Sequence, residues 1–221
     1  MRRLLCAAVV AAVLAGAWPG LPATVTAGAQ GGFGPLPERY GEVADVRPGA
    51  ILVASRALGD PNFVQTVILL VHHGEDGAMG LVLNRRTDIP LGAVFESIEE
   101  ARDHSAPVFS GGPVVPTGAQ ALVRSSSPVA DGRQVVGEVY VLGSALALTR
   151  RLSGPIDEQR FRVYLGYAGW GPGQLEGEVR KRSWHIFDGE TAIVFDHEPD
   201  SLWQRQIRRA NVQMASTRPL R

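Results

Sequence analysis

Apolar residues of this chain occur in short runs that glycine, proline and polar residues separate. Runs rich in valine, isoleucine and leucine, or runs that alternate apolar with polar residues, predict β-strands. The predicted strands are 50–56, 64–71, 78–84, 108–110, 121–124, 134–142, 161–167, 183–187 and 191–195. Apolar residues three or four positions apart predict helices at 91–102, 144–152, 174–181 and 200–209. Most consecutive strands have no helix between them, so the pattern predicts an α+β fold.

The first residues have the pattern of a secretory signal peptide. Arg2 and Arg3 precede an apolar run over residues 4–15, which is too short to span a membrane comfortably. Ala17 and Ala29 each end an Ala-Gly-Ala triplet, so we expect a signal peptide at 1–29, with cleavage after residue 17 or residue 29. The mature protein would then be secreted or periplasmic, without a stable membrane span. The alternatives are an uncleaved membrane anchor and a cytoplasmic protein whose start is misassigned.

The remaining chain divides into a lead-in, one domain and a tail. Residues 30–47 are rich in glycine and proline and predict a flexible lead-in. Residues 48–210 carry the periodic apolar pattern and are numerous enough to bury one core, whereas residues 211–221 predict a loose tail. Cys6 lies inside the predicted signal peptide, so the mature protein would have no cysteine for a disulfide, a thiolate metal site or a nucleophile.

The charge balance does not indicate a nucleic-acid partner. The chain has 22 basic and 22 acidic residues, and loss of Arg2 and Arg3 leaves 20 basic residues against 22 acidic ones. Binding to nucleic-acid phosphates needs an excess of basic charge on one surface. The basic groups at 150–151, 180–182 and 205–209 fall at or near predicted helix ends, where they complement the helix dipole. We therefore expect an unidentified small ligand or protein partner, with the oligomeric state left open.

The stretch of residues 161–184 changes from a strand pattern through glycines into a helix pattern. Gly169, Gly171 and Gly173 surround Trp170, a large ring that is hard to place in a glycine-rich turn. Free backbone amides at the start of the following helix could bind an anion or a polar ligand. Alternatively, the glycines let the strand and the helix approach closely, and the segment is a packing turn.

The same stretch is one of three blocks that resemble the AlgH/YqgE family. The blocks are LGYAGWGPGQLEGEV at 165–179, ILVASRALGDPNFVQTVILLVHHGEDGAMGLVLNR at 51–85 and VFSGGPV at 108–114, in the order that the family shows. The resemblance implies a mixed, bifurcated β-sheet with a small barrel-like portion and surrounding helices. The family has no agreed activity or cofactor, and one member carries the name of a transcriptional regulator.

The three blocks together define a candidate binding cleft. The candidate residues are Gly166, Tyr167, Gly169, Trp170, Gly171, Gly173, Gln174, Glu176, Asn84, Gly111 and Gly112. This chain departs from the family pattern at two places. Arg85 and Arg86 follow Asn84 where the family usually has a proline soon after, and Arg124 stands where a histidine is common.

Other polar clusters do not predict catalysis or metal binding. His72, His73, Glu75 and Asp76 are of metal-ligating types, but adjacent histidines on a strand face opposite ways, so we expect an exposed hairpin loop over 72–77. The chain has no G-x-S-x-G motif, and carboxylates one or two residues apart on a helix do not face each other. We expect no catalytic residue, metal or cofactor.

These observations predict a non-catalytic, exported domain that binds a ligand or a partner. The alternatives are a transcription-related regulator, as the family name suggests, and a hydrolase whose catalytic residues are dispersed along the chain.

Overall fold

The computed structural model describes residues 40–215, and in this range ten strands form one mixed sheet. The strands are β1 (Ala50–Ala54), β2 (Val67–Gly74), β3 (Gly77–Val82), β4 (Arg86–Pro90), β5 (Pro107–Ser110), β6 (Val114–Arg124), β7 (Arg133–Val136), β8 (Val139–Leu142), β9 (Phe161–Trp170) and β10 (Trp184–Asp188). The main path through the sheet is β10-β1-β2-β3-β9-β6-β8-β7. Strand β5 pairs with both β4 and β9 beside this path.

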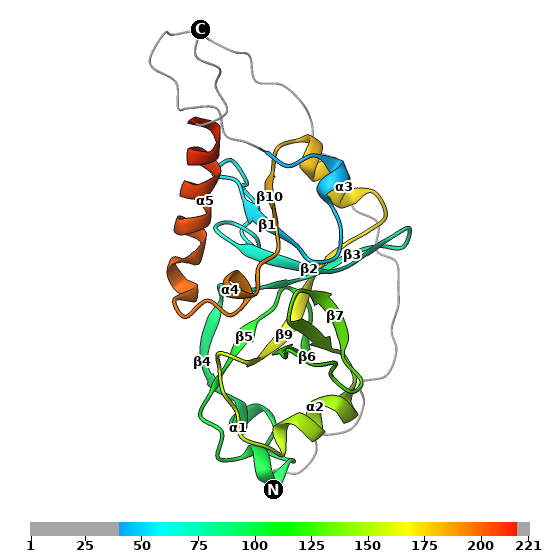
Figure 1. The fold of residues 1–221 in the computed structure, drawn as a ribbon, viewed down its shortest axis with the longest axis vertical. Coiled ribbons are helices and arrows are strands. Elements are labelled where there is room, and N and C mark those ends of the chain that lie inside the picture. The colour runs from blue at the N-terminus through cyan, green and yellow to red at the C-terminus, as the bar shows by residue number, and fades with distance from the viewer. Residues whose placement is uncertain (1–39, 216–221) are drawn as a thin grey trace, which may run out of the picture. The chain divides into compact units, whose positions relative to one another are not determined.

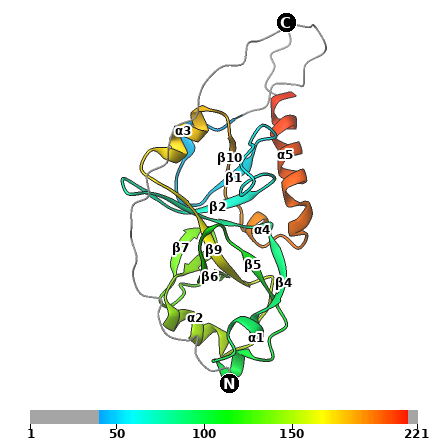
Figure 2. The same ribbon diagram turned by 180° about the vertical axis from the view of Figure 1, so that it is seen from behind.

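Strand β9 belongs to two parts of the sheet (Figures 1 and 2). Its first half pairs with β6 in antiparallel and with β5 in parallel orientation. Its last three residues pair instead with β3, which leads to β2, β1 and β10. Both views show β4, β5, β6 and β7 gathered round the first half of this shared strand. The expected α+β class with a mixed, bifurcated sheet and a barrel-like portion is therefore confirmed.

Short helices and one long helix surround the sheet (Figure 1). They are α1 (Leu91–Val94), α2 (Ala145–Leu152), α3 (Gln174–Arg180), α4 (Thr191–Val194) and α5 (Pro199–Ala215), with 3₁₀ turns η1 (Val43–Asp45) and η2 (Glu99–Ala101). Ser144 caps the start of α2, since its hydroxyl accepts a hydrogen bond from the Ala147 amide at 3.1 Å. Such a cap satisfies one of the amides that a helix start leaves free.

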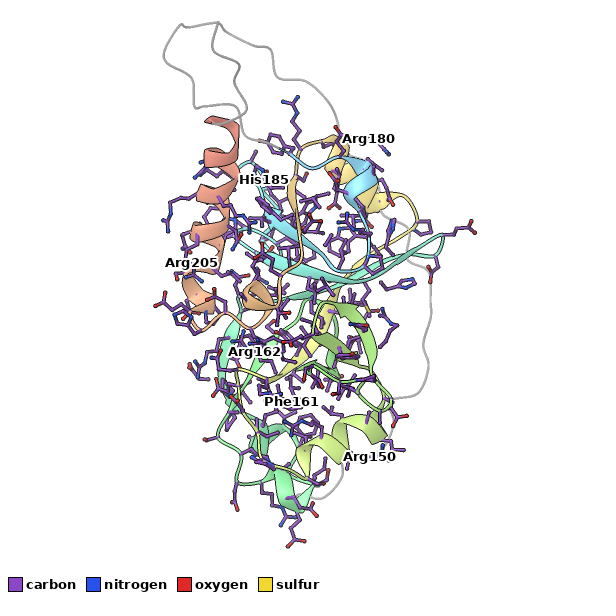
Figure 3. All side chains as sticks on the ribbon, viewed as in Figure 1. Arg150, Phe161, Arg162, Arg180, His185 and Arg205 are labelled. Atoms are coloured by element: carbon purple, nitrogen blue, oxygen red, sulfur yellow. The ribbon has the colours of Figure 1, made fainter. Side chains whose placement is uncertain are left out.

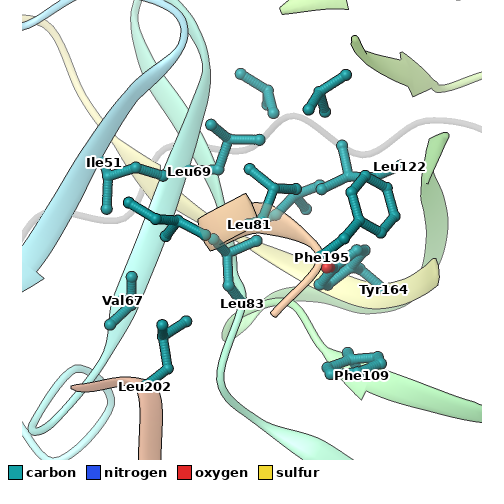
Figure 4. Packing of buried hydrophobic residues seen from close by; sticks show 14 of the residues in the cluster. Ile51, Val67, Leu69, Leu81, Leu83, Phe109, Leu122, Tyr164, Phe195 and Leu202 are labelled. Carbon is teal, nitrogen blue, oxygen red and sulfur yellow. The ribbon is translucent and has the colours of Figure 1, made fainter. Parts of the chain in front are cut away.

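The sheet is buried on both faces near β1 and β2. All five residues of β1 are buried, which explains its unbroken apolar sequence. Ile51 and Val53 point into a core shared with α4 and α5, which Figure 4 shows, and Leu52 points into a second core shared with α3. A third core lies between α1, α2 and the curled part of the sheet.

The predicted helix over residues 91–102 is wrong. The structure has only α1 and η2 there, and the chain turns back between them. The Gly92 amide donates to the His104 carbonyl at 3.0 Å, and a Cβ on Gly92 would lie 2.1 Å from the Arg102 carbonyl oxygen. Phe95 and Ile98 still pack against the third core from this compact loop. The apolar spacing therefore correctly predicted which side chains face the core. The conformation of the segment, however, depends on the close contact between the backbones of Gly92 and Arg102.

The predicted strand over residues 191–195 is also wrong, since these residues form α4. Ile193 and Val194 are buried in the first core. Arg162 of β9, labelled in Figure 3, lies buried beside them and donates hydrogen bonds to the carbonyls of Val194 at 3.2 Å and Asp196 at 2.6 Å. A cation at these carbonyls stabilises the helix end, so a tertiary contact overrides the strand preference of β-branched residues.

Several strand limits differ from the sequence prediction. The histidines expected in a loop belong to β2, and only Glu75 and Asp76 make the turn into β3. Strand β6 begins at Val114, the predicted strand 134–142 is the hairpin of β7 and β8, and β4 was not predicted. Most notably, β9 continues to Trp170, so this tryptophan ends a strand and does not lie in a turn.

The predicted signal peptide, most of the lead-in and the end of the tail lie outside the described residues. At the end of the predicted lead-in, the Tyr40 ring stacks on His185 at 4.6 Å, and Val46 is buried. Helix α5 runs to Ala215, beyond its predicted end. No helix within residues 40–215 combines the length and the apolar character that crossing a membrane requires.

Candidate functional site

The three sequence blocks meet at the point where β9 passes from one part of the sheet to the other. The Gly111 amide donates to the Leu165 carbonyl at 2.7 Å, and the Val82 amide donates to the Gly111 carbonyl at 3.0 Å. Gly111 thus joins the backbones of β3 and β9 directly. A Cβ on Gly111 would lie 2.3 Å from the Gly166 carbonyl oxygen, which no side chain tolerates.

Gly112 and Gly166 are required at this crossing for two reasons. Both have positive φ, +149° and +70°, which side chains of L-residues rarely adopt. A Cβ on Gly166 would also lie 2.3 Å from the Gly112 carbonyl oxygen, and one on Gly112 would lie 2.2 Å from the Tyr167 carbonyl carbon. Gly111, Gly112 and Gly166 therefore act by letting backbones touch.

Trp170 is part of the second core. Its side chain is 4% exposed, and its ring stacks on Phe63 at 5.9 Å and meets Trp184 edge-on at 6.0 Å. The indole N–H of Trp170 donates to Oε2 of Glu178 at 3.0 Å, and the indole of Trp184 donates to the same oxygen at 2.8 Å. One carboxylate on α3 thus ties together the ends of β9 and β10.

The start of α3 satisfies its own polar groups in part. Gly173 has φ +71° and precedes the helix, and the Gln174 side-chain oxygen accepts a hydrogen bond from the Gly171 amide at 3.1 Å. The Gln174 side-chain nitrogen donates to Glu178 at 3.0 Å. This arrangement holds the strand against the helix, as the packing interpretation of the turn requires.

The two histidines of β2 have different partners. Nε2 of His73 lies 2.6 Å from Oε1 of Glu176 on α3, and Nε2 of His72 lies 2.9 Å from Oδ1 of Asp76 in the hairpin turn. The hydrogen bond from His73 holds the pKa of Glu176 below its ordinary value, against the opposite effect of burial. The hydrogen bond from His72 lowers the pKa of Asp76 in the same way. Residues 40–215 contain no group of three or more histidine, cysteine, aspartate or glutamate side chains that could hold a metal ion.

An open groove of about 400 Å³ lies beside the end of β9, and we call it the β9 groove. Its lining residues come from β2, the hairpin turn, β3, β6 and β9. They are His72, Asp76, Gly77, Ala78, Met79, Val114, Tyr167, Gly169 and Trp170. Apolar and aromatic groups form most of this surface, and the His72–Asp76 pair adds an imidazole and a carboxylate.

The structure gathers only part of the predicted cleft into this groove. Tyr167, Gly169 and Trp170 line it, whereas Gly111, Gly112, Gly166, Gly171, Gly173, Gln174 and Glu176 do not. Asn84 lies at the other end of β3, where its side chain accepts from the Val67 amide at 2.8 Å and donates to the Gln65 carbonyl at 2.9 Å. The predicted cleft lacked the other lining residues, although all of them lie within the matched blocks: His72, Asp76, Gly77, Ala78, Met79 and Val114.

Comparison with known proteins agrees with this architecture. The family model described as AlgH-like matches residues 51–215. A UPF0301 protein of Sphingopyxis alaskensis is 36% identical over 167 residues, covering 74% of this chain and 89% of the relative. A UPF0301 protein of Thioalkalivibrio sulfidiphilus is 39% identical over 176 residues, covering 74% and 89%.

Solved structures show the same fold. The solution structure of the AlgH protein from Pseudomonas aeruginosa is 30% identical, with a TM-score of 0.61 over 79% of this chain and 95% of that one. A crystal structure of a Corynebacterium diphtheriae protein, 21% identical, has a TM-score of 0.63 over 75% of this chain and 90% of that one. With the family model matched over most of its length, the chain belongs to the AlgH-like family.

Proposed function

We propose that this protein is a non-catalytic binding domain that acts outside the cytoplasm and holds an apolar or aromatic group in the β9 groove. The group would belong to a small ligand or to a side chain of a partner polypeptide. The observation that carries the proposal is the mixed lining of the groove, in which aromatic, thioether and aliphatic groups surround one exposed His72–Asp76 pair. Ligand sites commonly combine a mostly apolar lining with a few polar groups that fix orientation.

The groove has side chains suited to holding an aromatic group. Met79 has a flexible, polarisable thioether, which makes favourable contacts with aromatic rings. The Gln120 side-chain amide lies 3.6 Å from the Met79 sulfur and helps to fix its position. Tyr167 offers a ring with a polar tip, and both residues are only partly buried. The volume of about 400 Å³ falls within the usual range of about 300–1,000 Å³ for small-molecule sites.

We assign the His72–Asp76 pair to recognition of a polar group on the ligand. A carboxylate beside an imidazole is also the arrangement that orients a general base, so the pair is the feature of the groove that a hydrolase would use. Both side chains are exposed, at 47% and 77%, and can therefore reach a ligand that enters from solvent.

Export is supported by the charged start and apolar run of residues 1–29, which lie outside the described residues.

The test uses N-acetyl-tryptophanamide, a neutral aromatic amide, as the probe and the Met79 methyl group as the reporter. The chain has three methionines, so selective methyl labelling gives a simple NMR spectrum in which Met79→Leu identifies the reporter. We expect a saturable shift of the Met79 signal. Gly169→Ala should weaken binding at least tenfold, because its Cβ would lie 3.1 Å from the Tyr167 ring and 3.3 Å from the Val114 methyl, inside the groove.

Gly171→Ala is the matched control. A Cβ on Gly171 would contact only the Gln174 side-chain oxygen, at 3.9 Å, so this variant should bind as the unchanged protein does. Equal binding by Gly169→Ala and Gly171→Ala, or no Met79 shift at millimolar probe, would overturn the groove as the site. Turnover of a simple ester that His72→Ala abolishes would overturn the non-catalytic assignment.

A further inference from the structure

A second cavity, of about 250 Å³, lies at the opposite end of β3 from the β9 groove. Its walls come from the segment before β2, from the link between β3 and β4 and from the start of α5. Val64, Gln65, Arg85 and Trp203 are the lining residues that matter here, and we call this space the Arg85 cavity.

The side chain of Arg85 has no hydrogen bond or ion pair within the part of the chain that the structure describes, although it is half-buried. Burial lowers the pKa of its guanidinium below the ordinary value, and the nearby Asp60 carboxylate offsets part of this effect. Asp60 compensates the lost hydration of Arg85 only through its charge, because it forms no hydrogen bond or ion pair with the guanidinium. An anion that entered the cavity would relieve this cost.

A larger cavity elsewhere provides a contrast. It has a volume of about 510 Å³ and lies between residues 40–47, β10 and α5. Its two arginines already have partners, since Arg47 pairs with Asp188, and Arg209 lies 2.9 Å from Glu190. In that cavity both arginines form ion pairs with the protein itself, whereas the Arg85 guanidinium forms no ion pair within residues 40–215, so its N–H donors are available to a ligand.

The remaining walls restrict the kind of anion. Asp60 acts on Arg85 through its charge, and Asp200 lines the cavity, so a second negative charge on the anion would add repulsion that the single charge of Arg85 does not offset. A single carboxylate matches the planar fork of a guanidinium and carries one charge. Val64, which is 45% exposed, and Trp203 form apolar walls beside it.

The cavity walls are held in place by defined contacts. The indole N–H of Trp203 donates to the Ala54 carbonyl at 2.8 Å, which fixes the ring against β1. The Asn84 side chain donates to the Gln65 carbonyl at 2.9 Å and so holds Gln65, a non-glycine residue with φ +57°. A non-glycine residue keeps this sparsely populated conformation only where surrounding contacts hold it, so the Asn84 hydrogen bond fixes this wall of the cavity.

We propose that the Arg85 cavity binds a small monocarboxylate with an apolar or aromatic body. The guanidinium of Arg85 pairs with the carboxylate, and the body of the ligand packs against Trp203 and Val64. The site is separate from the β9 groove, so neither proposal depends on the other.

The test follows the indole ¹⁵N–¹H signal of Trp203 during titration with phenylacetate at low salt. Phenylacetamide, the neutral analogue, and inorganic phosphate serve as comparison probes. We expect a saturable shift with phenylacetate, at least tenfold weaker binding of phenylacetamide, and weaker binding of phosphate. Arg85→Gln should weaken phenylacetate binding at least tenfold.

The matched control for Arg85→Gln is Arg86→Gln, because Arg86 is the exposed neighbour, 3.6 Å from Glu158, and is not among the residues that line the cavity. Arg86→Gln should bind phenylacetate within twofold of the unchanged protein. Asp60→Asn should bind two- to fivefold more tightly, since it removes a competing charge and keeps the oxygen that accepts from the Asn62 amide. This gain does not depend on whether Arg85→Gln folds.

Four results would overturn the proposal. They are the absence of a Trp203 shift at millimolar phenylacetate, equal binding of phenylacetate and phenylacetamide, unchanged binding after Arg85→Gln in a folded protein, and unchanged binding after Asp60→Asn. Tighter binding of phosphate than of phenylacetate would overturn the assignment to a monocarboxylate. A Gly169→Ala variant should leave the phenylacetate response of Trp203 unchanged.

Discussion

Replacement of Trp170 by alanine tests whether this residue serves the core or a ligand. The side chain is 4% exposed, stacks on Phe63 and meets the ring of Trp184. Deletion of a large buried aromatic side chain usually costs about 3–5 kcal/mol, because apolar contacts are lost and a cavity remains. The hydrogen bond to Glu178 is also lost, but that carboxylate still accepts from Trp184 and Gln174, so it is not left without partners.

We therefore expect Trp170→Ala to lower the free energy of unfolding by about 3–5 kcal/mol. For a domain of this size, each kcal/mol corresponds to about 2–4 °C in melting temperature, so the expected fall is about 6–20 °C. Thermal melts and urea titrations measure both quantities. Trp170→Phe is the control, since it keeps a ring against Phe63 and loses only the indole N–H and part of the volume, at a cost of about 1–2 kcal/mol.

A loss of less than about 1 kcal/mol for Trp170→Ala would refute this reasoning, because no well-packed aromatic residue is so easily removed. If, in addition, the Met79 methyl signal of this variant did not shift on addition of N-acetyl-tryptophanamide, Trp170 would be a ligand contact and not a core residue. The two outcomes are therefore separated by one variant and two measurements.

Further predictions concern a buried cation, acid stability, the mature N terminus and metal. Arg162→Met should destabilise the protein by about 2–3 kcal/mol in urea titrations, because it leaves the carbonyls at the end of α4 without their donor; a change below about 0.5 kcal/mol would contradict this role. The pKa of Glu176 is lowered mainly by its hydrogen bond from His73, so its contribution is present above the ordinary glutamate pKa of about 4.3 and is lost as pH falls through the lower folded value. Urea titrations from pH 6 to about pH 3 should show a smaller loss of stability for Glu176→Gln than for the unchanged protein, and parallel losses would remove the pair from the explanation. Mass spectrometry of the native protein should find a start at Trp18 or Gln30, and an intact first residue on a cytoplasmic protein would exclude export. Chelator and reductant should leave the melting temperature of the protein unchanged, whereas a fall of several degrees with chelator would reveal a metal site.

The local chemistry of the chain determined the existence of most strands and helices. The sequences of β1 and of the first five residues of β2 are unbroken apolar runs because all of these residues are buried, and such runs are visible in the sequence. Helix α2 was placed well because apolar spacing agrees with the Ser144 cap. The three glycine-containing blocks also identified the family, since their order and spacing are local facts.

Tertiary contacts decided what local patterns could not. The apolar spacing of 91–102 predicted one helix, and the composition of 191–195 predicted a strand. The observed conformations depend instead on the close approach of Gly92 to the Arg102 carbonyl and on the hydrogen bonds that Arg162 donates at the end of α4. The apolar residues of a segment predict that it is buried, but they do not predict which other segment it packs against. Each segment therefore adopts the conformation that its distant neighbours allow.

The candidate site shows the same division. The sequence marked Gly111, Gly112 and Gly166 as special, and their common reason is that three backbones cross at one point, which spacing alone cannot reveal. Met79, Val114 and Tyr167 come from three strands and form a groove only because β9 changes its pairing there. Likewise, the half-buried charge of Arg85 depends on the loop before β2 and on α5, which lie far from it in the sequence. The type of each residue is fixed by the sequence, whereas the burial of the Arg85 guanidinium and the meeting of groove residues from three strands arise only from the fold.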